Sequence, residues 1–107
     1  MIVHRKEWAS KMKPSKLLAS HRNEICRMVE QNHARNPRVF GSVLHGGDTD
    51  NSDLDLLVDP LPETTLLNLG ALQVELEQLL GIPVDILTPG DLPAKFREHV
   101  LKEAIPV

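Results

Sequence analysis

The feature that most constrains the fold is the hexapeptide Asp53–Val58, which reads DLDLLV. Successive side chains of a β-strand point to opposite faces, so Asp53 and Asp55 would share one face while Leu54 and Leu56 enter a core. The two carboxylates would lie roughly 6–7 Å apart along the chain. A strand that is apolar on one face and acidic on the other needs neighbouring strands and a second layer of structure over its apolar face.

Hydrophobic periodicity and turn residues predict the elements around this strand. Asn36-Pro37 should end the first helix, because the residue before a proline disfavours the helical region. The expected elements are a helix over 15–34, strands over 38–40, 53–58 and 84–87, a helix over 61–80, and a final helix capped by Asp91 that carries Leu92, Phe96 and Val100. The side chains expected to line the helical faces of the core are Leu18, Ile25, Met28, Val29, Leu66, Leu69, Leu72, Leu76, Leu79 and Leu80. This order predicts an α/β (α+β) fold, a small mixed β-sheet flanked by helices.

Length and composition bound the organisation of the chain. Its 107 residues suffice for one domain, which we place at 15–107 after a basic lead-in over 1–14. The single cysteine, Cys26, excludes an internal disulfide and a cysteine-based zinc site, which favours a reducing compartment. No apolar run reaches the length of a membrane span, and the N-terminus turns polar too early for a signal peptide. We therefore expect a soluble, cytoplasmic protein.

Charge is distributed unevenly along the chain. Residues 1–38 hold nine Lys or Arg and three Asp or Glu, whereas residues 39–94 hold ten Asp or Glu and no Lys or Arg. The basic lead-in has no interleaved aromatic pattern or known binding motif, so direct binding of nucleic acid is not expected. The chemistry is instead expected in the acidic middle of the chain.

Three aspartates of this middle region form a candidate metal site. Asp85 lies between Val84 and Ile86, so it points away from the face that those two bury. If its strand neighbours the one over 53–58, then Asp85 joins Asp53 and Asp55. Hard carboxylate oxygens suit Mg²⁺ or Mn²⁺, and a divalent cation would relieve their mutual repulsion. The alternative for the acidic pair is a solvated strand end that discourages pairing with other sheets.

Gly41-Ser42, which follows a predicted strand, is a candidate phosphate site. Glycine allows the backbone to approach a ligand closely, and serine offers a hydroxyl and an amide to an anion. Phosphate at this turn and metal at the carboxylates is the arrangement that nucleotidyl transfer requires, because metal ions neutralise phosphate charge and activate the attacking hydroxyl. A remaining carboxylate of the aspartate cluster could then accept the proton of that hydroxyl.

The signature Val39-Phe40-Gly41-Ser42, ten residues, then Asp53-Leu54-Asp55 resembles that of the DNA polymerase β-like nucleotidyltransferases. The small size and the segment 81–89 are similar to the minimal nucleotidyltransferases, antitoxins that are paired with HEPN toxins in prokaryotes. The resemblance runs from about Met12 to Val107. It implies the nucleotidyltransferase fold, with Asp53 and Asp55 as the metal-binding catalytic pair, Asp85 as the third metal ligand, and Gly41 and Ser42 at the nucleotide phosphates.

The resemblance also implies an activity: transfer of AMP from ATP, with Mg²⁺, to a tyrosine hydroxyl of a cognate HEPN ribonuclease, which silences that toxin in a hetero-oligomer. Two alternatives stay open, an antitoxin that acts by stoichiometric binding alone and a nucleotidyltransferase for a small molecule. One position departs from the family pattern, since Leu44-His45 stands where many relatives have Ala-Arg. A cation for the triphosphate would then come from the metal, Arg38, Lys95, Arg97 or the partner.

Overall fold

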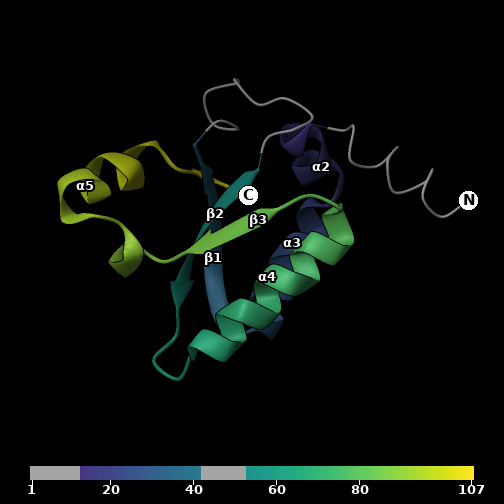
Figure 1. The fold of residues 1–107 in the computed structure, drawn as a ribbon, viewed down its shortest axis with the longest axis horizontal. Helices are drawn as coiled ribbons and strands as arrows, with labels where there is room; N and C mark the ends of the chain where they lie inside the picture. The colour runs from purple at the N-terminus through teal and green to yellow at the C-terminus, as the bar shows by residue number, and fades with distance from the viewer. Residues whose placement is uncertain (1–12, 42–52) are drawn as a thin grey trace, which may run out of the picture.

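In a computed structural model, the protein is described over residues 13–41 and 53–107 (Figure 1). The lead-in over 1–14 thus lies mostly outside the described residues, as do Ser42 and His45. The elements are α2 (Pro14–Ser20), α3 (Arg22–Gln31), β1 (Ala34–Phe40), β2 (Leu54–Pro60), α4 (Leu66–Leu80), β3 (Val84–Leu87), the 3₁₀ turn η1 (Pro89–Asp91), α5 (Ala94–Glu103) and β4 (Ile105–Pro106).

The strands form one four-stranded mixed sheet in the order β3-β2-β1-β4. β2 pairs antiparallel with β1 and parallel with β3, and β4 pairs antiparallel with β1. Parallel neighbours need a crossover connection, and α4 supplies it between β2 and β3. The mixed sheet with flanking helices confirms the predicted fold class.

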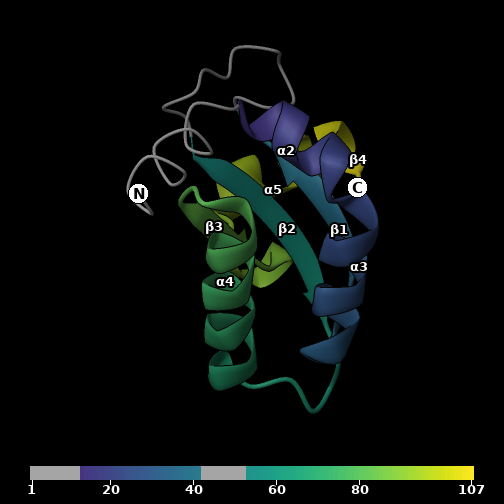
Figure 2. The same ribbon diagram turned by 90° about the vertical axis from the view of Figure 1, so that its right-hand side faces the viewer.

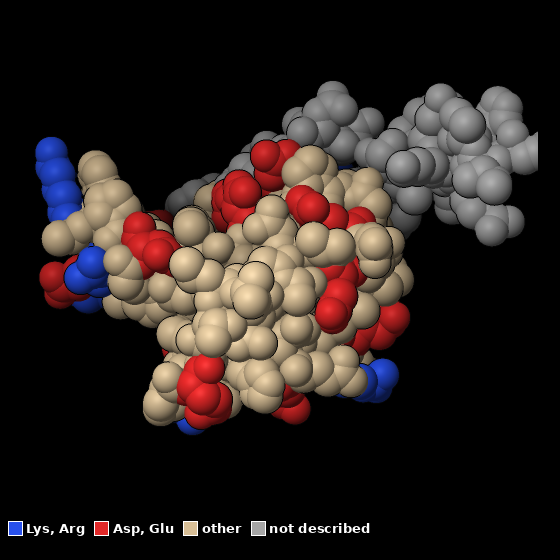
Figure 3. Space-filling view, turned by 60° about the horizontal axis from the view of Figure 1, so that its bottom comes forward, with Lys and Arg blue, Asp and Glu red and all other residues tan. Residues whose placement is uncertain are grey.

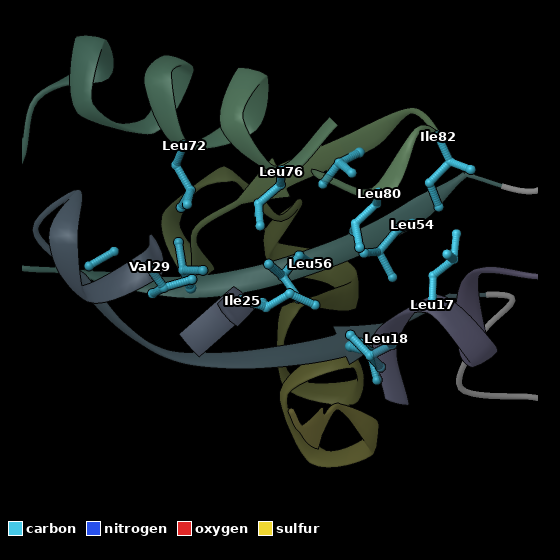
Figure 4. Packing of buried hydrophobic residues seen from close by; sticks show 14 residues of the cluster. Leu17, Leu18, Ile25, Val29, Leu54, Leu56, Leu72, Leu76, Leu80 and Ile82 are labelled. Atoms are coloured by element: carbon cyan, nitrogen blue, oxygen red, sulfur yellow. The ribbon is translucent and has the colours of Figure 1, made fainter. Parts of the chain in front are cut away.

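The two faces of the sheet are covered differently. α3 and α4 lie over one face, and η1 and α5 lie on the opposite side (Figures 1 and 2). The hydrophobic core fills the space between the sheet and α2, α3 and α4 (Figure 4). Its fully or nearly fully buried members are Leu17, Leu18, Ile25, Val29, Ala34, Val39, Leu54, Leu56, Val58, Leu72, Leu76, Leu80, Ile82 and Val84. Asp55, Leu57 and Asp59 of β2 thereby lie on the side away from this core.

The predicted helix over 15–34 is two helices, and it ends earlier than expected. The chain breaks at His21, whose backbone leaves the helical region, so that Pro14 and Leu17 of α2 are buried together with Ile25 of α3. α3 ends at Gln31 because the Asn32 side chain donates to the carbonyl oxygen of Met28 at 2.8 Å. The following residue, His33, has a φ of 62°.

Asn36-Pro37, predicted to end that helix, lies inside β1. The strand begins at Ala34, and its register with β2 shifts between Arg35 and Arg38, as in a β-bulge. Asn36 has a φ of 55°, in the left-handed region that asparagine tolerates better than most residues. The Asn-Pro pair therefore interrupts a ladder rather than a helix.

Two later boundaries also differ from the prediction. α4 begins at Leu66 rather than Leu61, because Thr65 and Asn68 form a reciprocal capping box. Asp91 does not cap α5; its side chain accepts from the Thr88 amide at 3.0 Å and closes η1. The two-residue strand β4 had no signal in the sequence, since its partner is β1, more than sixty residues away.

The predicted core faces are largely confirmed. The exception is Leu66, which is 86% exposed. Leu69, Leu79 and Met28 are partly buried against the core. No helix in the described part of the chain is long and apolar enough to span a membrane.

Candidate active site

Asp55 and Asp85 face each other across the pair β2–β3. The parallel ladder places Asp55 directly beside Asp85, with Leu54 beside Val84 and Leu56 beside Ile86. Because alternate residues point to opposite faces, the two leucines enter the core while the two carboxylates share the opposite face. The register thus brings together two of the three aspartates that the sequence singled out.

The ionised carboxylates of Asp55 and Asp85 interact unfavourably when no ligand is bound. The pKa of Asp55 is raised above its usual value of 3.8, first by burial, then by the charge of Asp85 and a hydrogen bond between the two carboxyl groups, and last by the charge of Asp53. Burial and neighbouring negative charge both penalise the ionised form. The fold therefore holds Asp55 where its carboxylate is poorly stabilised by other groups of the chain.

Asp53 lies apart from Asp55 and Asp85, at the edge of the site. It lies just before β2 and is exposed, although its charge reaches Asp55. Within residues 13–41 and 53–107, no three His, Cys, Asp or Glu side chains are grouped closely enough to hold a metal ion. The side chains form a pair, Asp55 and Asp85, with Asp53 at its edge.

Gly41 lies against the Asp55 carboxylate at the end of β1. Its φ is +79°, a conformation that L side chains rarely adopt. A Cβ built on Gly41 would overlap the Asp55 Oδ2 atom and lie 3.4 Å from Cγ. Glycine is therefore required at this position for two reasons, the backbone conformation and the close approach. Its predicted neighbour in phosphate binding, Ser42, is outside the described residues.

Glu77 of α4 is a supporting residue that sequence reasoning did not identify. Its Oε2 atom accepts a hydrogen bond of 3.0 Å from the backbone amide of Val84, the first residue of β3. This bond fixes the start of β3 one residue before Asp85. Glu77 occupies a helix position with no distinguishing motif, so only the folded chain shows its role.

Arg38 was one of the residues expected to supply positive charge to the triphosphate. In the structure its side chain instead pairs with Asp59. It donates from Nη2 to Asp59 Oδ1 at 2.6 Å, and Asn36 donates to the other oxygen of Asp59 at 3.0 Å. Only 13% of the Arg38 side chain is exposed. Arg97 of α5 donates from Nη2 to the Leu92 carbonyl at 3.0 Å, and its Nε is buried without a partner among the described residues.

The donor set fits a small divalent cation. Mg²⁺ is usually bound by one or two carboxylates together with waters and substrate phosphates, rather than by a complete cage of protein ligands. Asp55 and Asp85 supply two adjacent hard oxygen donors whose mutual repulsion a cation would relieve. Gly41, at the end of β1, lies against one of these two carboxylates, that of Asp55.

Comparisons with known proteins agree with this geometry. Residues 23–107 match the family described as polymerase beta, nucleotidyltransferase. The protein adenylyltransferase MntA of Thermococcus cleftensis is 34% identical over 89 residues, which cover 83% of this chain and 87% of that protein. MJ0435 of Methanocaldococcus jannaschii, named as a candidate protein adenylyltransferase, is 30% identical over 86 residues, which cover 80% and 92% of the two chains.

Solved structures show the same fold. One described as a candidate minimal nucleotidyltransferase superposes with a TM-score of 0.79 at 41% identity, over 87% of this chain and 95% of that chain. A chain from a crystal structure of a toxin–antitoxin with AMP-PNP superposes with a TM-score of 0.66 at 21% identity, over 78% and 69% of the two chains. The register of Asp55 with Asp85, the close approach of Gly41 and these matches lead to one conclusion: this chain belongs to the polymerase beta nucleotidyltransferase family.

Proposed function

We propose that this chain is an antitoxin that transfers AMP from ATP to a tyrosine hydroxyl of a cognate HEPN toxin ribonuclease and so silences it. The pairing of Asp55 with Asp85 beside Gly41 is the observation that carries the proposal. Two relatives with protein adenylyltransferase in their names support the reaction class, and the toxin–antitoxin neighbour supports the biological setting.

In the proposed reaction, the tyrosine oxygen attacks the α-phosphorus of ATP and the bond from that phosphorus to the bridging β-phosphate oxygen breaks. Pyrophosphate leaves, and the tyrosine proton passes to a carboxylate of the site or to water. Bound Mg²⁺ would supply charge neutralisation at the phosphates and a lower pKa for the attacking hydroxyl. Asp53, Asp55 and Asp85 would hold the metal, and Gly41 and Ser42 would hold the phosphates.

The residues of the proposed site contribute to the reaction through their positions in the fold. Asp55 and Asp85 are fixed by strand register rather than by flexible loops, so they present their oxygens in a constant geometry. The Glu77 bond to Val84 holds Asp85 at the start of its strand. Because Gly41 has no side chain, the end of β1 can approach the Asp55 carboxylate closely. These residues position the reacting groups and supply charge, and both effects dominate the catalysis of phosphoryl transfer.

The test is mass spectrometry of the partner. The protein encoded beside this chain is incubated with it, ATP and Mg²⁺, and its mass is expected to rise by one or more AMP units at a tyrosine. The double variant Asp53→Ala/Asp55→Ala should leave that mass unchanged. Glu30→Gln, a charge change at an exposed carboxylate of α3 away from the site, is the matched control and should retain transfer.

The result also separates catalysis from the simpler alternative. An antitoxin that acts by binding alone would leave the partner unmodified and would still block toxicity in the Asp53→Ala/Asp55→Ala variant. That pair of results would overturn the proposed transfer.

A further inference from the structure

The outer face of α4 exposes an unusual amount of apolar surface. We define the α4 outer face as Leu66, Leu67, Gly70, Ala71 and Val74, all of which are exposed. Leu66 and Leu67 are each 86% exposed and Val74 is 53% exposed. The opposite side of the same helix buries Leu72, Leu76 and Leu80 in the core. α4 is therefore apolar on the side that the fold covers and also on a side that it leaves open.

The sequence of this helix shows why the exposed face is not an ordinary surface. Residues 64–74 contain no charged residue, although a surface helix normally carries charged or polar side chains on its outer side. Contiguous exposed apolar surface that is rimmed by polar residues is characteristic of protein–protein contacts. A Cβ atom placed on Gly70, which lies within this face, would meet no heavy atom of the described residues within 4 Å, so packing among those residues does not require the glycine.

Charge around the face identifies the kind of partner. Residues 61–80, which include α4, carry three acidic residues, Glu63, Glu75 and Glu77, and no Lys or Arg. Glu63 comes one residue before the uncharged run and Glu75 one residue after it. In Figure 3, acidic side chains lie around a broad uncharged area, and Lys and Arg appear only at the edges of the view. An apolar surface in an acidic setting is complementary to an apolar surface flanked by Lys and Arg.

The same charges argue against other occupants. A second copy that docked through its own α4 outer face would bring two acidic rims together, and like charges across an interface are costly. Nucleic acid and anionic membrane surfaces are repelled for the same reason. We therefore infer that the α4 outer face is the docking surface for a partner protein whose contact region is apolar and flanked by basic residues. The inference rests on the proposed function in taking the toxin as that partner.

The experiment measures the affinity of the purified chain for the protein encoded beside it, by titration calorimetry without ATP. Omitting ATP makes the measurement independent of catalysis. Leu67→Glu is expected to raise Kd by about 10- to 100-fold, because one central apolar anchor contributes about 1–3 kcal/mol to such an interface. Its melting temperature should match that of the wild type, since Leu67 makes no core contact at 86% exposure.

Asn23→Glu is the matched control. Asn23 is an exposed residue of α3, so this variant also adds one negative charge to an exposed helix position, but away from α4. It should leave Kd within about twofold of the wild type, because exposed charges far from an interface are largely screened. The wild-type Kd should also rise with salt, as expected for an acidic surface that meets a basic one.

Three results would overturn the inference: equal affinity of Leu67→Glu and wild type, no complex at all, or self-association of the wild type that Leu67→Glu abolishes. The last would make a second copy the occupant. Failure of the proposed transfer is read separately, from the partner's mass after incubation with ATP and Mg²⁺. A partner that binds through Leu67 but gains no mass would contradict the transfer and support the docking surface.

Discussion

Two aspartates of β2 on the same face of the sheet have opposite environments. Asp59 lies four residues after Asp55, so both point away from the main core. The carboxylate of Asp59 meets the Arg38 guanidinium at 2.6 Å and the Asn36 amide at 3.0 Å. Asp55 lies beside another carboxylate, Asp85, and its pKa is raised by burial and by that neighbour.

This difference separates a structural role from a functional one. An acid that is paired with a cation and an amide stabilises the fold, and here it ties the bulge of β1 to β2. An acid that is partly buried beside another acid opposes folding and gains a favourable partner only when a cation binds. Substitutions at Asp55 and Asp59 should therefore have different effects on ligand binding and on stability.

The largest expected difference is in stabilisation by ligand. Saturating Mg²⁺ with ATP should raise the melting temperature of the wild type by roughly 10 °C, because a ligand present at about 100 times its Kd adds about 2.7 kcal/mol to a domain of this size. Asp55→Asn should lose most of that shift, while Asp59→Asn should keep it. Thermal denaturation with and without Mg²⁺–ATP measures this rise in melting temperature. An equal rise in all three proteins would show that Asp55 is not part of the ligand site.

Two glycines provide the next comparison. Gly41→Ala should destabilise the protein by at least about 1–2 kcal/mol, because a side chain at positive φ is strained and its Cβ would displace the Asp55 carboxylate. Gly70→Ala, in the middle of α4 with open space around it, should stabilise by about 0.5–1 kcal/mol. Urea unfolding measures both free energies.

Transfer activity adds a second measurement for Gly41. Gly41→Ala should also lower AMP transfer, because its Cβ would displace a carboxylate of the proposed site. If Gly41→Ala retained full transfer, then the close approach of the turn to Asp55 would have no part in the reaction.

The two aspartate substitutions should also change the stability of the protein without ligand, with opposite signs. Asp59→Asn should cost about 1–2 kcal/mol, a value between those of exposed and buried ion pairs, because Arg38 loses its charged partner. Asp55→Asn should raise the melting temperature by a few degrees at neutral pH, because it removes a carboxylate whose ionised form is disfavoured. Loss of stability in both variants would mean that Asp55 is also a structural acid.

The pH dependence of the stability difference between the wild type and Asp55→Asn tests whether the ionised Asp55 carboxylate causes that difference. Since the folded-state pKa of Asp55 lies above 3.8, the folded protein binds this proton more tightly than the unfolded chain does. Its stabilising contribution is fully present below pH 3.8 and is lost as the pH rises through the folded pKa. The wild type should therefore become less stable than Asp55→Asn with rising pH, in thermal melts without metal. A difference between the two that does not change with pH would exclude this titration.

Sequence reasoning located the acidic residues better than it located the element boundaries. The alternation of Asp and Leu in 53–56 predicted that Leu54 and Leu56 are buried, because period-two alternation leaves a strand only one way to face a core. Leu57, on the face of Asp55, is also buried, which the alternation did not predict. Helix ends were less predictable. α2 ends at the non-helical backbone angles of His21, and α3 ends where the Asn32 side chain bonds to the Met28 carbonyl oxygen. No local sequence pattern predicts either feature. Leu66 follows the apolar period of α4 but lies on its open side.

Local patterns predicted a strand that carries Asp53 and Asp55 on one face, Gly41-Ser42 ahead of it, and another strand that carries Asp85. These patterns arise from side-chain alternation and turn chemistry among near neighbours. The folded chain adds what such patterns do not contain: Asp85 lies in register with Asp55, Gly41 lies against Asp55, and Arg38 pairs with Asp59. Strand pairing and charge pairing join residues that are far apart in the chain, so shared burial, and not neighbouring sequence, selects each partner.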